Sequence, residues 1–152
     1  MVKKTVYSPL GSLTLSEENG FLTALSWANA HIENEGNTTP ELSCTADEIK
    51  AYFNGELKVF TKPYQLKGTP FQKKIWQAMS EIPYGETRTY GELARMLNTS
   101  ARAVGGACGK NPLPIIVPCH RVLAAGNKIG GYSGGKGRTT KEKLLALEKR
   151  FN

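Results

Sequence analysis

The chain has 152 residues, which is enough for one domain, or one domain with a small appendage, built on a sizeable hydrophobic core. No stretch approaches the roughly 18 apolar residues of a membrane-spanning helix, and the first residues lack the hydrophobic region of a signal peptide. We therefore expect a soluble, intracellular protein with no membrane partner.

The three cysteines, at positions 44, 108 and 119, are odd in number and show no C-x-x-C spacing. This pattern predicts neither a disulfide framework nor a zinc knuckle. His31 and Cys44 could be read as half of a metal site, but two candidate ligands without partners make that unfavourable. We expect no metal and no cofactor, and reduced cysteines, one of which can be a nucleophile.

The net charge of +7 is unevenly distributed along the chain. Residues 1–68 hold six Lys/Arg against eight Asp/Glu, a net charge of −2, whereas residues 69–152 hold fourteen against five, a net charge of +9. Such asymmetry favours a polyanionic partner for the second half, and nucleic acid is the commonest one. A solvated basic face without a partner remains the alternative.

The first half predicts a small antiparallel sheet followed by a helix. Residues 4–27 alternate between apolar and polar side chains and are interrupted by two turn signals. The polar stretch 28–40 predicts a loop, and Thr45 with Glu48 has the spacing of a capping box that opens a short amphipathic helix. Residues 57–66 predict an extended linker to the second half.

The second half is predicted to be mostly helical. Each helix start carries a capping residue, and the three starts are Thr69 with Gln72, Thr89 with Glu92, and Ser100 or Thr99. The last two helices are short and are joined by a tight polar turn at Asn98-Thr99, which predicts a helix-turn-helix.

The second helix of this motif is unusual for a DNA-reading helix, because it presents only Arg102 among small residues. Recognition helices in the major groove usually carry several Arg, Asn or Gln side chains. A smooth helix with one arginine instead suits the minor groove or the backbone, where Arg102 could insert into the duplex. The alternative is that Gly105, Gly106 and Ala107 only allow two helices to pack closely.

The stretch Ile-Ile-Val-Pro-Cys-His-Arg-Val (115–122) is the strongest candidate for chemistry. Residues 115–117 are β-branched and lie between two prolines, which predicts a short buried strand. Cys119 follows this strand, and a thiol becomes reactive when a neighbouring cation lowers its pKa, as His120 and Arg121 could do. The alternative is a buried structural thiol.

Two further segments could complete a site around Cys119. Asn111 lies in the turn before the strand and could be a turn residue only, or the amide that holds the backbone beside the cysteine. The glycine-rich stretch 130–135 lacks phosphate-binding spacing, so it suggests the wall of a pocket for a flat ring, with a plain flexible loop as the alternative.

The last helix is predicted to start at Thr139, with Glu142 as its capping partner. Glu148 falls on or beside the leucine stripe of this helix, and a half-buried carboxylate needs a partner. Glu148 could orient His120, whose other nitrogen would take the thiol proton, by the logic of other activated nucleophiles. If the stripe is narrower, Glu148 is a surface residue.

These segments resemble the O6-alkylguanine-DNA alkyltransferases. The resemblance spans about residues 69–149 and rests on Ile-Val-Pro-Cys-His-Arg-Val (116–122), Arg-Ala-Val-Gly-Gly-Ala (102–107), Asn111-Pro112 and Gly-Gly-Tyr-Ser-Gly-Gly (130–135). It implies single-turnover, irreversible transfer of an alkyl group from guanine O6, and also from O4-alkylthymine, in double-stranded DNA to a cysteine. It also implies a protein that acts as a monomer.

The family pattern implies a role for each matching residue. Cys119 would be the nucleophile, His120 its general base through a water, and Glu148 the carboxylate that polarises His120. Asn111 would support the active-site turn. The remaining matching residues would contact DNA from the minor-groove side or line the base pocket: Arg102, Tyr90, Ala103 and Gly106 for DNA, and Tyr132, Ser133 and Val122 for the base.

Two of the DNA contacts have specific implied roles, because a base must leave the stack before it can be attacked. Arg102 would fill the gap left by the flipped nucleotide. Tyr90 would rotate the phosphate and donate a proton to the departing guanine. The turn Asn98-Thr99 looks shorter than in some members, and the first 68 residues match only loosely and show no zinc-ligand set such as certain members carry.

The expected fold is α+β, with an N-terminal structural domain over 1–68 and a helical DNA-binding and catalytic domain over 69–152. Three other functions stay open. A cysteine hydrolase would use the same relay but would also need an oxyanion hole. A non-catalytic protein that binds alkyl lesions would have no use for Cys119, and a helix-turn-helix regulator would need a richer recognition helix.

Overall fold

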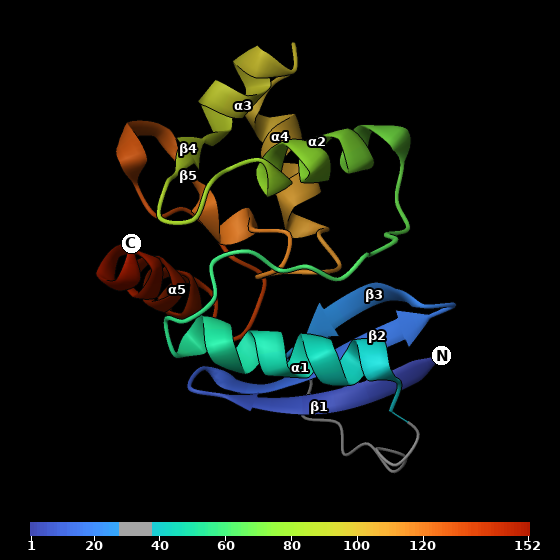
Figure 1. Ribbon diagram of the computed structural model, residues 1–152. Coiled ribbons are helices and arrows are strands. Elements are labelled where there is room, and N and C mark those ends of the chain that lie inside the picture. Colours follow the sequence, from blue (N-terminus) through green and yellow to red (C-terminus); the bar gives the residue numbers. More distant parts are fainter. Residues whose placement is uncertain (28–37) are drawn as a thin grey trace. The chain divides into compact units, whose positions relative to one another are not determined.

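The computed structural model describes residues 1–27 and 38–152, and this part of the chain forms two compact units, Met1–Lys67 and Gly68–Asn152 (Figure 1). The first unit holds a three-stranded antiparallel sheet and one long helix, and the second holds four α-helices and a two-stranded parallel sheet. The predicted α+β class is confirmed. The predicted loop falls mostly, and His31 entirely, outside the described residues.

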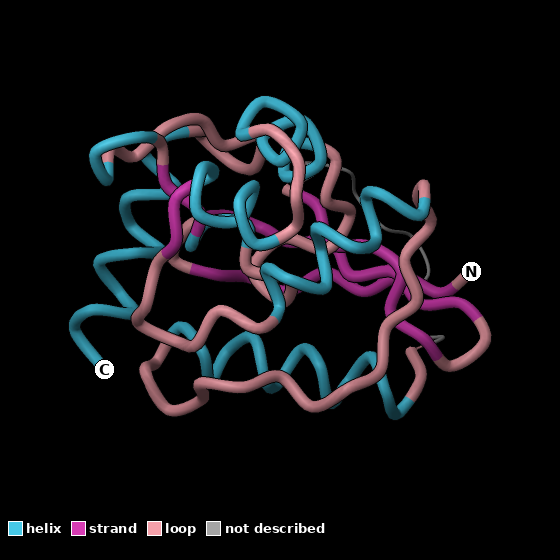
Figure 2. The backbone as a smooth tube through the Cα atoms, turned by 90° about the horizontal axis from the view of Figure 1, so that it is seen from above, coloured by secondary structure: helices cyan, strands magenta, loops and turns pink. Residues whose placement is uncertain are grey.

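The sheet of the first unit is a meander of β1 (Val2–Ser8), β2 (Gly11–Glu18) and β3 (Phe21–Ser26), with β2 in the centre (Figure 1). Strands are drawn in magenta in Figure 2. The β2–β3 turn places Asn19 and Gly20 at φ of 53° and 82°, the left-handed conformation that a tight hairpin requires at both positions. The predicted antiparallel sheet is therefore present.

Helix α1 (Pro40–Phe53) begins six residues earlier than predicted, so the capping box assigned to Thr45 and Glu48 was wrong. Thr39 is the N-cap and accepts a hydrogen bond from the backbone of Leu42. Thr45 lies inside the helix and donates its hydroxyl proton to the carbonyl of Glu41. The proline at the first helical position fixes the earlier start, because its φ suits a helix and it has no N–H to satisfy.

The segment after α1 is extended, as expected for residues 57–66, and it runs beside β3. The backbone N–H of Leu22 donates to Pro63, and that of Gln65 donates to Leu22, at 3.1 and 2.9 Å. These two bonds cover part of the free edge of β3, which limits unwanted strand pairing there.

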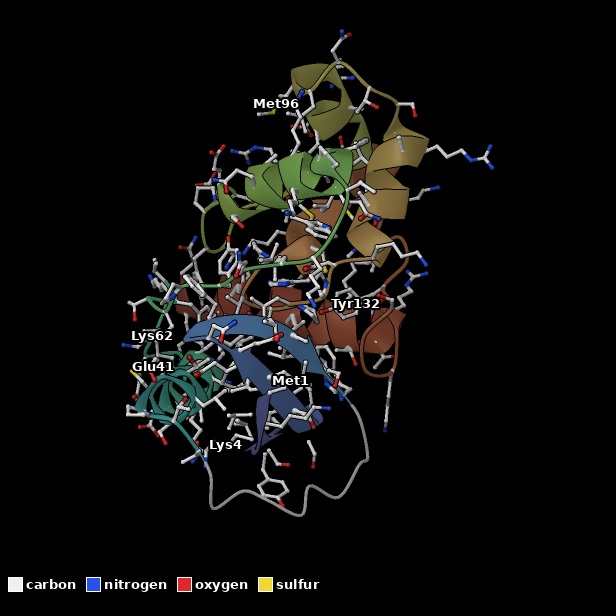
Figure 3. The ribbon with its side chains drawn as sticks, turned by 90° about the vertical axis from the view of Figure 1, so that its right-hand side faces the viewer. Met1, Lys4, Glu41, Lys62, Met96 and Tyr132 are labelled. Carbon is white, nitrogen blue, oxygen red and sulfur yellow. The ribbon has the colours of Figure 1, made fainter. Side chains whose placement is uncertain are left out.

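The helix-turn-helix predicted in the second half is present. Helices α3 (Tyr90–Met96) and α4 (Ala101–Gly109) pack against each other, and α2 (Pro70–Ser80) packs against α4. The capping boxes of α2 and α3 are complete, and Ser100 caps α4. Met96 lies 67% exposed at the end of α3, next to the turn (Figure 3).

The strand predicted at 115–117 is absent, and these residues form a buried turn instead. Val117 donates its N–H to Leu113 at 2.9 Å, and Ile115 has a φ of 75°. An apolar run predicts burial but does not distinguish a strand from a tight turn, and the two prolines remove two of the N–H groups that a strand would pair. The true strand, β5 (Val122–Leu123), comes later and pairs in parallel with β4 (Arg88–Thr89).

Helix α5 (Arg138–Phe151) closes the second unit, and its predicted capping box at Thr139 was also wrong. The helix starts one residue earlier, after Gly137 at a φ of 65°, and Glu142 pairs with Arg138 rather than with the helix N-terminus. Among the residues that the structure describes, no helix is long and apolar enough to cross a membrane.

Candidate active site

Asn111 holds the turn that carries the cysteine. Its side-chain amide donates to the carbonyl of Val117 at 2.8 Å, and its side-chain oxygen accepts the N–H of Leu113 at 3.0 Å. Hydrogen bonding by the same side chain also acts to lower the pKa of the Cys119 thiol. One amide thus joins the two ends of the turn, which fixes a backbone that includes the left-handed Ile115.

Cys119 opens the 3-10 turn Cys119–Arg121 and is only 6% exposed, yet it lines a cavity of about 300 Å³. Burial raises the pKa of its thiol, while hydrogen bonds from Asn111 and Tyr132 and the charge of Lys141 act in the opposite direction. The adjacent His120 and Arg121 were predicted to lower the pKa of this thiol, and that prediction was wrong, because the pKa is raised. The thiol is therefore protonated at neutral pH and needs a base before it can attack.

His120 and Glu148 are in direct contact. The Nε2 atom of His120 lies 2.6 Å from Oε2 of Glu148, and the two residues are 0% and 1% exposed. Glu148 is on the buried face of α5, so the surface alternative for this carboxylate is wrong. When Nε2 carries the proton, its N–H donates a hydrogen bond to Glu148, and Nδ1 is the basic nitrogen.

The electrostatics of this pair favour a neutral imidazole. Burial lowers the pKa of His120, and the charges of Arg121 and Lys141 lower it further, against the raising effect of Glu148. The pKa of Glu148 lies well below its ordinary value, because hydrogen bonds and charges from His120 and Arg121 outweigh its burial. The Nδ1 atom of His120 has no hydrogen-bond partner within the described ranges, so it is available to accept a proton.

The cavity beside Cys119 is formed by α3, α4 and the glycine-rich loop, all of the second unit. Its lining comprises Tyr90, Gly105, Cys108, Gly109, Cys119, Gly131, Tyr132 and Ser133. Two of the three residues predicted for the base pocket, Tyr132 and Ser133, are among these. Val122 is fully buried and is not part of the lining. Burial raises the pKa of Tyr90 to about 12, so its hydroxyl keeps its proton at neutral pH.

Helix α4 carries three of the four residues predicted to contact DNA, and these lie outside the cavity, whereas the fourth, Tyr90 on α3, lines it. Arg102 and Gly106 are exposed and Ala103 is half-buried, and none of the three lines the cavity. A Cβ atom added to Gly105 or Gly106 would meet nothing within 4 Å. Close helix packing therefore does not explain these glycines.

Ala107, the third small residue, behaves differently from the glycines. It is buried, and its carbonyl accepts the indole N–H of Trp76 at 2.8 Å, so it does serve the contact between α2 and α4. The small residues of α4 thus divide into a packing position and an open face that a ligand can approach closely.

Two residues of the site, Lys141 and Cys108, were missed by sequence reasoning, and a third, Arg121, was assigned to the thiol and not to Glu148. Lys141 is 0% exposed and donates to the carbonyls of Val122 and Gly131, Arg121 forms two hydrogen bonds with Glu148, and Cys108 lines the cavity. Lys141 could have been found, because it lies three residues before Leu144 and seven before Glu148, on the buried face of the helix. Nothing in the sequence distinguishes Cys108, whose burial raises its pKa to about 12.

A helix-turn-helix whose second helix also forms one wall of a cysteine-lined cavity is the architecture expected of a DNA-binding protein with a thiol in its candidate site. Two family models match the chain. Residues 70–150 match "6-O-methylguanine DNA methyltransferase, DNA binding domain", and residues 1–66 match "6-O-methylguanine DNA methyltransferase, ribonuclease-like domain". The chain belongs to the 6-O-methylguanine DNA methyltransferase family, which confirms the resemblance drawn from residues 69–149.

Curated relatives agree with this assignment over nearly the whole chain. A methylated-DNA–protein-cysteine methyltransferase of Mycobacterium tuberculosis (strain ATCC 25618 / H37Rv) is 46% identical, covering 96% of this chain and 91% of the relative. The constitutive methylated-DNA–protein-cysteine methyltransferase of Bacillus subtilis (strain 168) is 40% identical, covering 95% and 93%.

Solved structures agree as well. The O6-methylguanine methyltransferase of Mycobacterium tuberculosis matches with a TM-score of 0.84 and 44% identity, over 99% of this chain and 93% of that one. The same organism's protein in complex with DNA matches with a TM-score of 0.86 and 45% identity, over 98% and 93%. The first 68 residues, which match the family only loosely in their sequence motifs, therefore belong to it as well.

Proposed function

We propose that this protein repairs DNA by moving the alkyl group of an O6-alkylguanine, or of an O4-alkylthymine, onto the sulfur of Cys119, once per protein molecule. The observation that carries the proposal is the cavity lined by both Cys119 and Tyr90, on a unit that also bears a helix-turn-helix. Family membership favours this function over a hydrolase, a regulator or a non-catalytic lesion binder.

The first step is activation of the thiol. Because burial keeps the Cys119 thiol protonated, its proton must pass to a base as the sulfur attacks. Neutral His120 is that base, through one water molecule at Nδ1, and Glu148 stabilises the imidazolium that forms. His120 thus has the role that the histidine has beside other cysteine and serine nucleophiles, where a carboxylate fixes the tautomer of the imidazole.

The second step is transfer of the alkyl group. The sulfur forms a bond to the alkyl carbon as the bond from that carbon to O6 breaks, and the electron pair stays on the guanine. Tyr90, whose pKa of about 12 keeps its hydroxyl protonated, donates a proton to the departing base. The proton held by His120 returns to Tyr90 through solvent. The product is a thioether at Cys119, which no group in the site can reverse.

DNA would be held along the open face of α4. A stacked base cannot reach a buried sulfur, so the damaged nucleotide must rotate out of the duplex at a cost of a few kcal/mol. The exposed Gly106 and half-buried Ala103 allow the backbone to approach α4 closely, and Arg102 fills the space that the base leaves. Tyr132 and Ser133 would then form part of the wall around the extruded base.

The setting of the protein follows from its substrate. We propose that it acts in the cytoplasm, free or associated with the nucleoid, as a monomer with one protein per lesion. Residues 1–68 would serve as a structural domain, and residues 69–152 as the DNA-binding and catalytic domain.

The test is intact-mass and peptide mass spectrometry after incubation with duplex DNA that carries one O6-methylguanine. We expect one methyl group per protein molecule, on the peptide that contains Cys119. The matched control is the same DNA with unmodified guanine, and Cys119→Ser should take up nothing. Methylation of Cys108 or Cys44 instead, or turnover beyond one equivalent, would contradict the proposal.

A further inference from the structure

The carboxylate of Glu148 is shared between two basic side chains. Its Oε2 atom lies 2.6 Å from Nε2 of His120 and also accepts Nη2 of Arg121 at 3.1 Å. Its Oε1 atom accepts Nε of Arg121 at 2.8 Å and the backbone N–H of Gly85 at 3.2 Å. The imidazole therefore does not have this negative charge to itself.

Arg121 is fixed in this position by contacts of its own. Its Nη1 atom donates to the carbonyl of Ile82 at 2.7 Å, its guanidinium lies 5.7 Å from the ring centre of Tyr84, and the residue is only 7% exposed. A planar guanidinium that binds both oxygens of a carboxylate is strongly oriented and is always charged. The cation therefore competes with His120 for Glu148 at every pH at which the protein is folded.

We propose that Arg121 is a positioning residue that keeps His120 neutral in the free protein by sharing the charge of Glu148. The proposal rests on the proposed function, in which His120 is the base for Cys119. An imidazole beside an undivided carboxylate is readily protonated, and an imidazolium cannot accept the thiol proton. Arg121 thus reserves the basic nitrogen for the reaction.

The charged groups around His120 agree with this role. Helix α5 contributes Glu148, which favours the imidazolium, and Lys141, which disfavours it, while Arg121 on the same 3-10 turn also disfavours it. From the loop after α2, the phenol of Tyr84 faces Glu148 and Arg121. Removing Arg121 deletes one of the two cations and leaves Glu148 with its charge undivided, so the pKa of His120 should rise.

The experiment uses the fact that the chain has two histidines. In a His31→Ala background, the single remaining imidazole is titrated by NMR, and the pH dependence of the single-turnover rate is measured on methylated duplex DNA. Two variants are compared, Arg121→Gln, which removes the charge, and Arg121→Lys, which keeps it without the planar fork.

We expect Arg121→Gln to move both the His120 titration and the acid limb of the rate profile upward by about one pH unit, a tenfold change in proton concentration. Arg121→Lys should leave both near the parent position. A parental position for Arg121→Gln, or an equal shift for Arg121→Lys, overturns the proposal. If Arg121→Gln does not fold, Arg121→Met, which also removes the charge, takes its place: an upward shift supports the role of charge, and a parental position refutes it.

The two readouts separate this proposal from the proposed function. The NMR titration needs no damaged DNA, so it reports on Arg121 even if the parent protein accepts no methyl group. A parent that fails to react overturns the proposed function, whereas a parent that reacts with a profile insensitive to the charge at position 121 overturns only the role of Arg121.

Discussion

The ammonium group of Lys141 donates a hydrogen bond to the main-chain carbonyl of Val122 at 2.7 Å, although Lys141 is fully buried. A second bond reaches the carbonyl of Gly131, and the same ammonium lies 5.7 Å from the ring centre of Tyr90. One cation therefore links α5 to the strand after the cysteine motif and to the glycine-rich loop. Its charge also lowers the pKa of Cys119 against the effect of burial.

Replacing Lys141 by methionine should therefore weaken the nucleophile as well as the loop. We expect Lys141→Met to raise the pKa of Cys119 and to slow alkyl transfer about tenfold, which corresponds to about 1.4 kcal/mol. The pKa is measured from the pH dependence of thiol alkylation by iodoacetamide. Lys143→Met, at an exposed position of the same helix, is the matched control and should behave like the parent. Equal alkylation profiles for Lys141→Met and the parent would argue against an electrostatic role.

Asn111→Ala should destabilise the protein, because the Val117 carbonyl loses its hydrogen-bond donor and the Leu113 N–H loses its acceptor inside the buried turn. We expect a loss of about 2 kcal/mol in the free energy of unfolding, from two hydrogen bonds of about 1 kcal/mol each. Urea denaturation measures it. Asn111→Asp is the matched comparison, since a carboxylate can still accept from Leu113 but cannot donate to Val117. An alanine variant as stable as the parent would show that the turn holds itself.

Features that depend on neighbouring residues were predictable from the sequence. The capping boxes at Thr69 and Thr89 are local patterns, and both are present. Thr45 and Thr139 have the same spacing, but each lies inside a helix that starts earlier, after Thr39 and Gly137. The pattern permits a helix start, and the choice between two permitted starts depends on backbone geometry that the spacing does not show.

The electrostatics of Cys119 were not predictable, because sequence neighbours are not spatial neighbours on a 3-10 turn. His120 and Arg121 both bind Glu148, whereas the cation whose charge lowers the pKa of the thiol is Lys141, 22 residues further along the chain. The contact between His120 and Glu148 was predictable because a carboxylate on an apolar stripe demands a partner. The buried Lys141 makes the same demand.

The stability of the folded protein should fall on acidification in two steps. The pKa of His120 is lowered by folding, so the unfolded chain binds the extra proton first and stability declines as pH drops below the ordinary value of 6.5. The pKa of Glu148 is also lowered, so its contribution is present above the ordinary value of 4.5 and is lost as pH falls below it.

Urea unfolding across this pH range measures both steps, and Glu148→Gln is the informative variant. It leaves Arg121 buried without its carboxylate, which should cost about 3 to 5 kcal/mol at neutral pH. It should also flatten the decline below 4.5. A parent protein that gains stability between pH 7 and 4 would contradict these assignments.

Affinity for DNA should fall steeply as salt rises, because residues 69–152 carry a net charge of +9. Phosphate contacts release counterions, so the logarithm of the binding constant should decline linearly with the logarithm of salt concentration, with a slope of about −0.9 per contacted phosphate. Fluorescence anisotropy on duplexes of two unrelated sequences measures the slope and should show little difference between them. An affinity independent of salt would rule out a phosphate-based interface.

Arg102→Ala should separate DNA handling from chemistry. Arg102 is exposed on α4 and does not line the cavity, so its loss leaves Cys119, His120 and Tyr90 in place. We expect repair of methylated duplex DNA to slow at least about tenfold, since no side chain then fills the gap that the extruded base leaves in the stack. Reaction with free O6-benzylguanine, which needs no base flipping, should change little. Lys149→Ala removes one exposed charge from α5 and controls for the general loss of positive charge. Equal losses of rate on both substrates would show that Arg102 supports the structure of the site and does not act in the duplex.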